Sequence, residues 1–255
     1  MLLENKIAVI TGASSGIGKA TARLFAKEGA ELAFLGRDDK ALQAIVAEVH
    51  ETGRPALAVP ANVTRIEDCG QAVQKAVEHF GGIDILVNAA GIIGNGTIKN
   101  TTPAAWDEMM CVNLNAAFYL MQLAAPYLEK SRGNIVNVSS VTGMRAFPNV
   151  LAYCVSKAGL DQLTRCAALE LASSGVRVNA VNPGVVVTNL HRRSGMDETK
   201  YAAFLEHSKT THPLGRVGRP EDVAEAILYL ASERSSWITG VTLSVDGGRQ
   251  LTCAR

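Results

Sequence analysis

A tyrosine and a lysine lie four residues apart in the stretch YCVSK, at Tyr153 and Lys157. On a helix this spacing places both side chains on one face. An ammonium group beside a phenol favours the phenolate and lowers the tyrosine pKa from its usual value of about 10. The pair is therefore a candidate for proton transfer, although two unrelated polar residues on a helix surface would give the same spacing.

Two more polar residues precede this pair at fixed distances. Ser140 ends the strand-like segment NIVNVSS, 13 residues before Tyr153, and Asn113 lies 40 residues before it in CVNLN. Taken singly, Ser140 could cap a helix or turn, Asn113 could be a satisfied helix amide and Lys157 a surface charge. Ser139 competes with Ser140, but strand alternation points the two side chains to opposite sides.

Cys154 stands next to Tyr153 and is a candidate nucleophile. We find no histidine or aspartate partner for it in the sequence. A small buried thiol is therefore the better interpretation.

A glycine-rich turn occurs early in the chain, in VITGASSGIGKATARLF. It lies between a strand-like run and a segment with helical apolar spacing. Glycines let the backbone approach a phosphate, and the helix N-terminus adds free N–H groups and the positive end of a dipole. A tight turn with incidental glycines is the alternative, but the strand–turn–helix context favours nucleotide binding. The candidate residues are Gly12, Ser14, Ser15, Gly16, Ile17 and Gly18.

These residues need elements that bring them together. Apolar, β-branched runs lie at 7–10, 32–35, 56–59, 85–87, 135–138, 176–181 and 241–245, and helix-patterned stretches lie near 17–28, 38–52, 66–80, 104–130, 153–173 and 220–232. Continuous apolar strands that alternate with helices predict a parallel sheet covered on both faces. We expect one doubly wound α/β domain over 1–255, with the polar segment 189–213 as a substrate lid.

Composition excludes several functions. The net charge of +1 gives no basic surface for nucleic acid, and no apolar run approaches the roughly 20 residues of a membrane span. The five cysteines form no CxxC pair, so no metal site is expected. Scattered cysteines and the absence of a signal-like N-terminus favour a cytoplasmic protein.

The Thr-Gly-x3-Gly-x-Gly turn together with Asn113, Ser140, Tyr153 and Lys157 resembles the short-chain dehydrogenase/reductase family, over 6–248. The resemblance implies a single-domain Rossmann fold with a seven-stranded parallel sheet and a catalytic tetrad. In such a tetrad Tyr153 exchanges a proton with the substrate oxygen and Ser140 hydrogen-bonds that oxygen. Lys157 lowers the tyrosine pKa and binds the nicotinamide ribose, and Asn113 holds a water of a proton relay.

The second strand-like run ends in ELAFLGRDDK, which bears on the cofactor. An acidic residue at this place binds the ribose 2′-hydroxyl, whereas an arginine accommodates a 2′-phosphate. Gly36 followed by Arg37 therefore predicts NADP(H), with NAD(H) as the alternative if Arg37 is only a solvated turn residue. We interpret Asp38 and Asp39 as the start of the next helix.

The resemblance extends the cofactor site to later strand ends. The family usually has Asn-Asn-Ala-Gly after the fourth strand, whereas this chain has Ala89 in the second position. The additional cofactor-binding residues that the resemblance implies are Asn62, Val63, Asn88, Gly91, Pro183, Gly184, Val186 and Thr188.

The substrate is the least defined part of the prediction. Residues expected to face it are mostly apolar, which favours a mid-sized hydrophobic ketone or secondary alcohol; any of them could instead be core. They are Ile93, Val141, Met144, Phe147, Val185 and Leu190. His191, Arg192 and Arg193 would attract an anionic tail, such as a phosphopantetheine-linked acyl group, unless they form a solvated lid face.

The C-terminal region resembles that of tetrameric family members, among them 3-oxoacyl-carrier-protein reductases, and this implies a homotetramer. We therefore expect an NADP(H)-dependent oxidoreductase that interconverts a carbonyl and an alcohol. The alternatives are a dedicated 3-oxoacyl thioester reductase and a cofactor-binding regulator without turnover. The presence of all four tetrad residues argues against the last.

Overall fold

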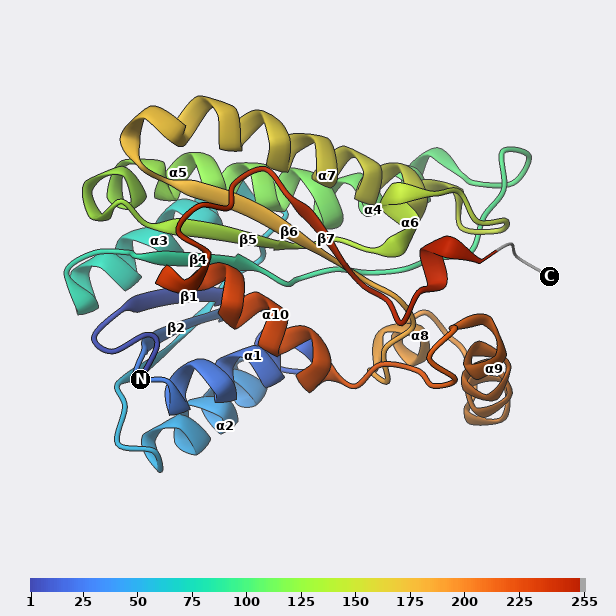
Figure 1. The fold of residues 1–255 in the computed structure, drawn as a ribbon, viewed down its shortest axis with the longest axis horizontal. Coiled ribbons are helices and arrows are strands. Elements are labelled where there is room, and N and C mark those ends of the chain that lie inside the picture. The colour runs from blue at the N-terminus through green and yellow to red at the C-terminus, as the bar shows by residue number, and fades with distance from the viewer. Residues whose placement is uncertain (253–255) are drawn as a thin grey trace.

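A seven-stranded, fully parallel sheet forms the centre of the molecule in the computed structural model, which describes residues 1–252 (Figure 1). Cys253 and the two residues after it lie outside the described residues. The strand order is β3-β2-β1-β4-β5-β6-β7. The strands are β1 (Ile7–Thr11), β2 (Glu31–Gly36), β3 (Ala56–Pro60), β4 (Ile85–Asn88), β5 (Asn134–Val138), β6 (Arg177–Pro183) and β7 (Thr242–Val245).

Helices cover both faces of this sheet, which confirms the doubly wound α/β fold. They are α1 (Gly16–Lys27), α2 (Asp39–His50), α3 (Ile66–Phe80), α4 (Pro103–Met110), α5 (Ala116–Ser131), α6 (Val141–Met144), α7 (Leu151–Leu171), α8 (Leu190–Arg193), α9 (Glu198–Thr211) and α10 (Pro220–Ala231). No helix within residues 1–252 is both long enough and apolar enough to cross a membrane.

Two separate apolar cores lie on the two faces because side chains alternate along each strand. Ile10 and Phe34 point into the core under α1, α2 and α10, whereas Val9 and Leu35 point into the core under α3, α5 and α7. All four are fully buried. The sheet therefore has no solvated face, and its polar chemistry is confined to the strand ends.

The strand order reverses beside β1, which pairs with β2 on one side and with β4 on the other. In open parallel sheets, ligands bind in the crevice outside the carboxyl ends of the strands at such a switch point. The glycine-rich turn follows β1 at this point, and α8 and α9 project beyond the same end of the sheet (Figure 1).

The structure differs from the predicted elements in three places. The helix expected near 104–130 is interrupted by a π-helical turn at Cys111–Asn115, between α4 and α5. The segment 189–213 contains two helices, α8 and α9, and a further four-residue helix, α6, follows β5. Helices of four residues are too short for periodicity to reveal them, and a π-turn depends on contacts that are distant in sequence.

Candidate active site

The glycine-rich turn is built for close backbone packing. Gly12 has a φ of 67°, and a Cβ on it would lie 2.8 Å from the Ala89 carbonyl oxygen. A Cβ on Gly18 would lie 2.4 Å from the carbonyl oxygen of Gly12. Side chains at either position would fill the space along the turn. The first turn of α1 contains no acidic residue, and Ser15, which precedes it, makes no side-chain capping bond. This helix N-terminus therefore suits an anionic group such as a phosphate.

The end of β4 is fixed against this turn by a hydroxyl. Thr11, buried at the end of β1, accepts hydrogen bonds from the N–H groups of Ala89 and Ala90, each at 3.0 Å. The side chain of Asn88 donates to Asn137 Oδ1 on β5 at 2.9 Å. The Oδ1 atom of Asn88 is buried and has no hydrogen-bond partner within the described residues, and the contact of Asn88 with a cofactor stays a prediction.

Tyr153, Lys157 and Ser140 come together at the carboxyl end of β5. Helix α7 carries Tyr153 and Lys157 on one face, with the lysine Nζ 5.9 Å from the centre of the tyrosine ring. Both side chains are buried, so neither is the surface residue that the spacing alone would have allowed. Ser140 directly precedes α6, and its hydroxyl accepts the N–H of Thr142 at 3.2 Å. The serine therefore also caps a helix.

The electrostatics of this group differ from the prediction. We expect from the sequence that Lys157 lowers the pKa of Tyr153, but burial raises that pKa to about 12, and the opposing interaction is a hydrogen bond with Ser140. Burial also lowers the pKa of Lys157 to about 8. The Lys157 Nζ donates to the Val138 carbonyl at 2.8 Å. The expected lowering of the Tyr153 pKa was wrong, because desolvation of the phenol outweighs the effect of a lysine that is itself poorly solvated.

Asn113 lies in the π-helical turn and connects three segments. Its Oδ1 accepts the N–H of Ile92 at 2.9 Å, and its Nδ2 donates to the Ile92 carbonyl at 3.0 Å and to Ser156 Oγ on α7 at 3.1 Å. The amide is thus satisfied by the protein, and any water that Asn113 holds must bind its backbone. A cavity of about 10 Å³ beside Asn113 is also lined by Thr11 and Asn88 but not by Lys157, so it does not by itself connect the lysine to solvent.

Comparison with known proteins agrees with this geometry. A family model described as "Enoyl-(Acyl carrier protein) reductase" matches residues 12–250. The chain is 42% identical over 251 residues to a 3-oxoacyl-[acyl-carrier-protein] reductase of Thermotoga maritima, covering 97% of this chain and 99% of the relative. It superposes with a TM-score of 0.91 and 34% identity on a short-chain type dehydrogenase/reductase from Mycobacterium marinum, covering 99% and 97% of the two chains. The chain belongs to the short-chain dehydrogenase/reductase family. It is an oxidoreductase of that family.

Other relatives bear on cofactor and substrate. A 3-ketoacyl-(acyl-carrier-protein) reductase from Brucella melitensis, complexed with NADH, superposes with a TM-score of 0.89 and 34% identity, covering 97% of this chain and 99% of that one. A cyclohexanol dehydrogenase of Acinetobacter is 38% identical over 246 residues, covering 96% of this chain and 94% of the relative. The family binds a nicotinamide cofactor, but the substrates named for its members differ widely.

In this short-chain dehydrogenase/reductase, the end of β2 leaves room beside Arg37. Arg37 is exposed, and a Cβ on Gly36 would meet only Leu42, at 3.5 Å or more, so packing does not require a glycine there. Asp38 caps α2 by accepting the N–H of Ala41 at 3.0 Å, which confirms that Asp38 and Asp39 begin a helix.

After β3, Asn62 and Val63 form a compact turn. Asn62 Oδ1 accepts the N–H of Thr64 at 3.2 Å, and the Asn62 N–H donates to Asp68 at 3.1 Å. Val63 is buried. The cofactor contact that the resemblance implies for both residues stays a prediction.

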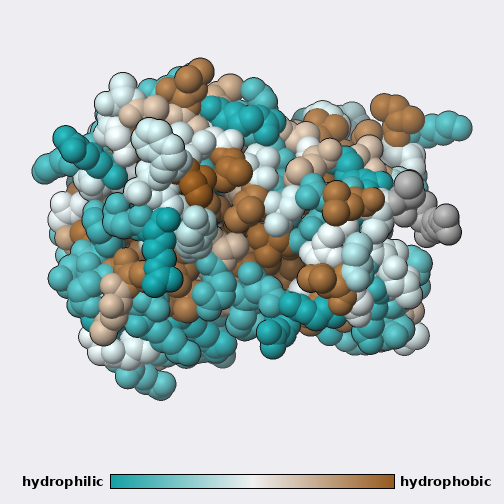
Figure 2. Space-filling view, viewed as in Figure 1, coloured by the Kyte–Doolittle hydropathy of each residue, from teal (hydrophilic) through white to brown (hydrophobic). Residues whose placement is uncertain are grey.

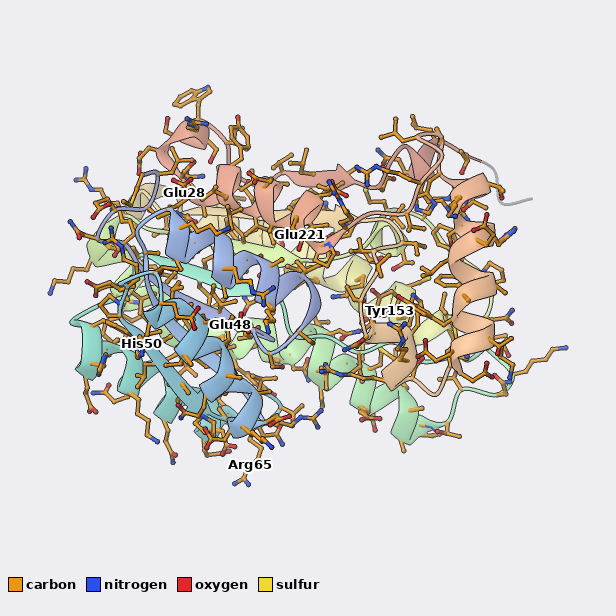
Figure 3. The ribbon with its side chains drawn as sticks, turned by 90° about the horizontal axis from the view of Figure 1, so that it is seen from below. Glu28, Glu48, His50, Arg65, Tyr153 and Glu221 are labelled. Carbon is orange, nitrogen blue, oxygen red and sulfur yellow. The ribbon has the colours of Figure 1, made fainter. Side chains whose placement is uncertain are left out.

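Apolar residues surround Tyr153 on the substrate side. The predicted substrate residue Ile93 packs in one small cluster with it, and its contact with substrate stays a prediction. The cluster also contains six residues that the sequence did not single out: Ile92, Trp106, Met109, Met110, Val150 and Ala152. Figure 3 shows Tyr153 toward the end of the molecule that carries α9. The cluster gives a ligand near the tyrosine hydroxyl an apolar surrounding.

The other predicted substrate residues are spread more widely. Val141 is buried, and Met144 is 44% exposed. Phe147 lies between two guanidinium groups, with Arg145 5.3 Å and Arg249 5.1 Å from its ring centre. Phe147 thus already has partners within the chain, and the structure does not bring it to Tyr153 as it brings Ile93.

The predicted lid is attached at both ends by residues that the sequence did not reveal. Tyr201 on α9, 1% exposed, accepts the N–H of Thr188 at 3.2 Å and donates to the Thr188 carbonyl at 2.9 Å. His212 Nε2 accepts the N–H of Val185 at 3.1 Å, while its Nδ1 donates to the Ser208 carbonyl at 2.6 Å. Burial lowers the pKa of His212, in keeping with this neutral, doubly bonded ring.

These two attachments position the residues after β6. The Thr188 methyl group would lie 3.1 Å from a Cβ on Gly16, so Thr188 covers the start of α1, and a Cβ on Gly184 would lie 2.7 Å from His212 Nε2. Pro183 ends β6, and Val186 is buried. Thr188 therefore lies beside the glycine-rich turn, whereas Gly184 packs against His212, and the cofactor contacts of the residues after β6 stay predictions.

The basic residues of the lid are largely engaged within it. Arg192 bonds Glu198 at 2.6 Å and stacks on Tyr201 at 4.0 Å. The His191 ring lies 4.6 Å from that of Phe204, whereas Arg193 is exposed. Within residues 1–252, no group of three histidine, cysteine or acidic residues is arranged to hold a metal ion.

Proposed function

We propose that this protein is an NADP(H)-dependent oxidoreductase that interconverts a ketone and a secondary alcohol. The observation that carries the proposal is the buried group of Ser140, Tyr153 and Lys157 at the end of β5. Gly91 connects this group to the cofactor side, because a Cβ on it would lie 3.6 Å from the Lys157 Nζ.

Each residue of the site has a separate role in the proposed reaction. The backbone of Gly12–Gly18 and the N-terminus of α1 hold the cofactor phosphates. When bound, the nicotinamide supplies the hydride. Ser140 hydrogen-bonds the substrate oxygen, and Tyr153 donates a proton to that oxygen as negative charge develops on it. Because its pKa is about 12, Tyr153 is fully protonated at neutral pH and ready to act as the acid in ketone reduction. Lys157, whose Nζ lies close to Gly91, would bind the ribose hydroxyls of the cofactor.

Substitution of Tyr153 tests the acid–base assignment. Oxidation of NADPH and NADH would be measured with a panel of ketones, aldehydes and 3-oxoacyl thioesters. Tyr153→Phe should lose about 10²–10⁴-fold in rate while cofactor binding is retained. Tyr229→Phe, at a tyrosine that is 41% exposed on α10, is the matched control and should match wild type. Retention of more than about a tenth of the activity by Tyr153→Phe would show the assignment to be wrong.

The preference for NADP(H) rests on Arg37 beside the small Gly36. A guanidinium suits a phosphate, and no acidic side chain stands at Gly36 to bind the 2′-hydroxyl. Arg37→Asp should shift the ratio of kcat/KM for NADPH over NADH toward NADH by at least about tenfold, as expected for loss of a charged contact. An unchanged ratio, or a wild-type enzyme that prefers NADH, would rule the preference out.

A second candidate is a dedicated 3-oxoacyl thioester reductase. The 42% identity to the Thermotoga reductase over nearly the whole of both chains favours it. The apolar cluster beside Tyr153 favours a broader range of hydrophobic ketones. Comparison of kcat/KM for a 3-oxoacyl carrier-protein conjugate and for cyclohexanone would separate the two. A protein with no turnover on any carbonyl would instead be the non-catalytic regulator.

We also propose a cytoplasmic homotetramer. Its support is exposed apolar surface: Phe118 on α5 and Val155 and Leu169 on α7 are 44%, 41% and 82% exposed. Figure 2 shows further apolar residues gathered on the face that carries β7, the edge strand of the sheet. Trp237, which precedes β7, is 99% exposed. Analytical ultracentrifugation at micromolar concentration would test the assembly, and a monomer would refute it.

A further inference from the structure

A buried carboxylate lies one helical turn beyond Lys157 and takes no part in the proton transfer proposed above. Asp161 on α7 is 2% exposed, and it forms no ion pair within the described residues. Its Oδ1 atom is buried and has no hydrogen-bond partner in the same part of the chain. A buried acid that is only partly bonded is costly and calls for an explanation.

The other oxygen of Asp161 connects to the backbone of Ser140 through one amide. Asn182 on β6 donates from its Nδ2 to Asp161 Oδ2 at 2.8 Å and to the Ser140 carbonyl at 2.9 Å. The carboxylate thereby fixes the orientation of Asn182, and Asn182 fixes the backbone that presents the Ser140 hydroxyl. All three residues are buried, so water does not compete for these bonds.

The turn that follows Ser140 packs directly on the same carboxylate. A Cβ on Gly143 would lie 2.5 Å from Asp161 Oδ2 and 2.8 Å from the Lys157 carbonyl oxygen. Ser139 adds a hydrogen bond from its Oγ to that carbonyl, at 3.2 Å. Residues 139–143 are thus held against the stretch of α7 between Lys157 and Asp161.

We propose that Asp161 is a positioning residue, whose carboxylate orients Ser140 through Asn182 and whose negative charge keeps the neighbouring Lys157 in its protonated form. The proposal rests on the proposed function, because it assigns Asp161 to the same reaction. Asp161 itself touches neither substrate nor cofactor.

Few charged groups surround Asp161 and Lys157. On α7 the charged groups near Asp161 are Lys157 and Arg165, while Ser139, Asn182 on β6 and Gly143 on α6 face it and carry no charge. Burial lowers the pKa of Lys157 to about 8, and the charge of Asp161 is what opposes this effect. Burial raises the pKa of Asp161, against the hydrogen bond from Asn182, which lowers it.

Asp161→Asn tests the proposal because it removes the charge and keeps an oxygen that can accept from Asn182. Ketone reduction should decline with rising pH as Lys157 loses its proton, and this decline should move at least about one pH unit lower in the variant. Activity at pH 6 should stay within about threefold of wild type, and activity at pH 8 should fall at least about fivefold. Glu170→Gln, at an exposed acid of the same helix, should leave the profile unchanged.

A readout without substrate separates this proposal from the proposed function. As the pH is raised, the contribution of Lys157 should make the unfolding free energy of wild type begin to rise near pH 8. In Asp161→Asn the rise should begin at least about one unit lower, whether or not Tyr153→Phe abolishes turnover. Superimposable profiles of the variant and wild type would overturn the proposal.

Should Asp161→Asn not fold, the wild-type enzyme still decides the question. The carbon NMR signal of the Asp161 carboxyl would be followed with pH in selectively labelled protein. The proposal requires an ionised carboxylate at pH 7, with a signal that responds when Lys157 titrates near pH 8. A carboxyl that is protonated at pH 7 would overturn it.

Discussion

Two regions lie at the same edge of the sheet but are held in different ways. The first is the end of β5 together with α7, and the second is the segment that contains α8 and α9. Ser140, Tyr153 and Lys157 are buried, and Ser140 and Lys157 are bound to the sheet through hydrogen bonds. Helix α9 is mostly exposed and is fixed to the strand ends chiefly through Tyr201 and His212. The first region contains buried ionisable groups, and the second pairs its charges at the surface.

This difference separates two tasks. Groups that move a proton must keep fixed positions and shifted pKa values, and burial provides both at the expense of stability. A segment that admits substrate needs few attachments, so that it can open at a low free-energy cost. The same comparison tells us which substitutions should abolish turnover, which should change affinity and which should do little.

The largest effect is expected inside the buried region, from Lys157→Met. Activity should fall at least about 100-fold, whereas the unfolding free energy at pH 7 should rise by about 2 kcal/mol because a desolvated ammonium is removed. The folded protein lowers the pKa of Lys157 from 10.5 to about 8, so between these values the unfolded chain binds more protons and wild-type stability rises with pH. The advantage of the variant should therefore shrink from pH 8 upward.

Chemical denaturation at pH 7 to 10 would measure this advantage. The raised pKa values of Cys69 and Tyr153 act in the opposite direction above their ordinary values of 9.0 and 10.0, but both groups are present in wild type and variant and cancel in the difference. Lys200→Met, at a lysine whose side chain is 78% exposed, is the control and should gain nothing. A variant less stable than wild type at pH 7 would mean that Lys157 is not a buried charge.

An intermediate effect is expected where the lid meets the strand ends, from Tyr201→Phe. The variant loses both hydrogen bonds to the Thr188 backbone, at a cost of about 1–3 kcal/mol for buried groups left unpaired. The KM for cofactor and substrate should rise by roughly tenfold with a much smaller change in kcat. Steady-state kinetics and thermal denaturation would measure both effects. A fall in kcat alone would instead show that Tyr201 acts in proton transfer, together with the buried residues at the end of β5.

The smallest effect is expected on the surface of the lid, from Arg192→Ala. Its ion pair with Glu198 is exposed to solvent, and such pairs contribute little. Activity on an uncharged ketone and the thermal midpoint should both stay close to wild type. The informative measurement is KM for a substrate with an anionic tail. A marked rise for that substrate alone would show that Arg192 leaves Glu198 to bind it.

Sequence reasoning worked best where local pattern and chemistry coincide. The glycine-rich turn and the Tyr153–Lys157 spacing depend on residues close in sequence, and both lie where they were expected. Sequence reasoning did less well for contacts between residues that are distant in sequence. The engagement of Phe147 by Arg249 and the attachment of Val185 by His212 join segments distant in sequence and leave no periodic signal.

The predicted shift of the Tyr153 pKa was wrong for a related reason. A spacing of four residues shows that a lysine is near, but not how deeply both groups are buried. Desolvation depends on everything packed around the pair, and here it reverses the sign of the expected shift.

The π-helical turn at Cys111–Asn115 sets the rotational phase between two helices. Each residue of an α-helix turns the chain by about 100°, so deleting one residue from this turn would rotate α4 relative to α5 by about that angle. Either Asn113 would leave Ile92 and Ser156, or Leu120 and Ala124 would leave the core beneath α5. One additional residue in the helix thus reconciles two angular requirements that a regular α-helix could not meet together.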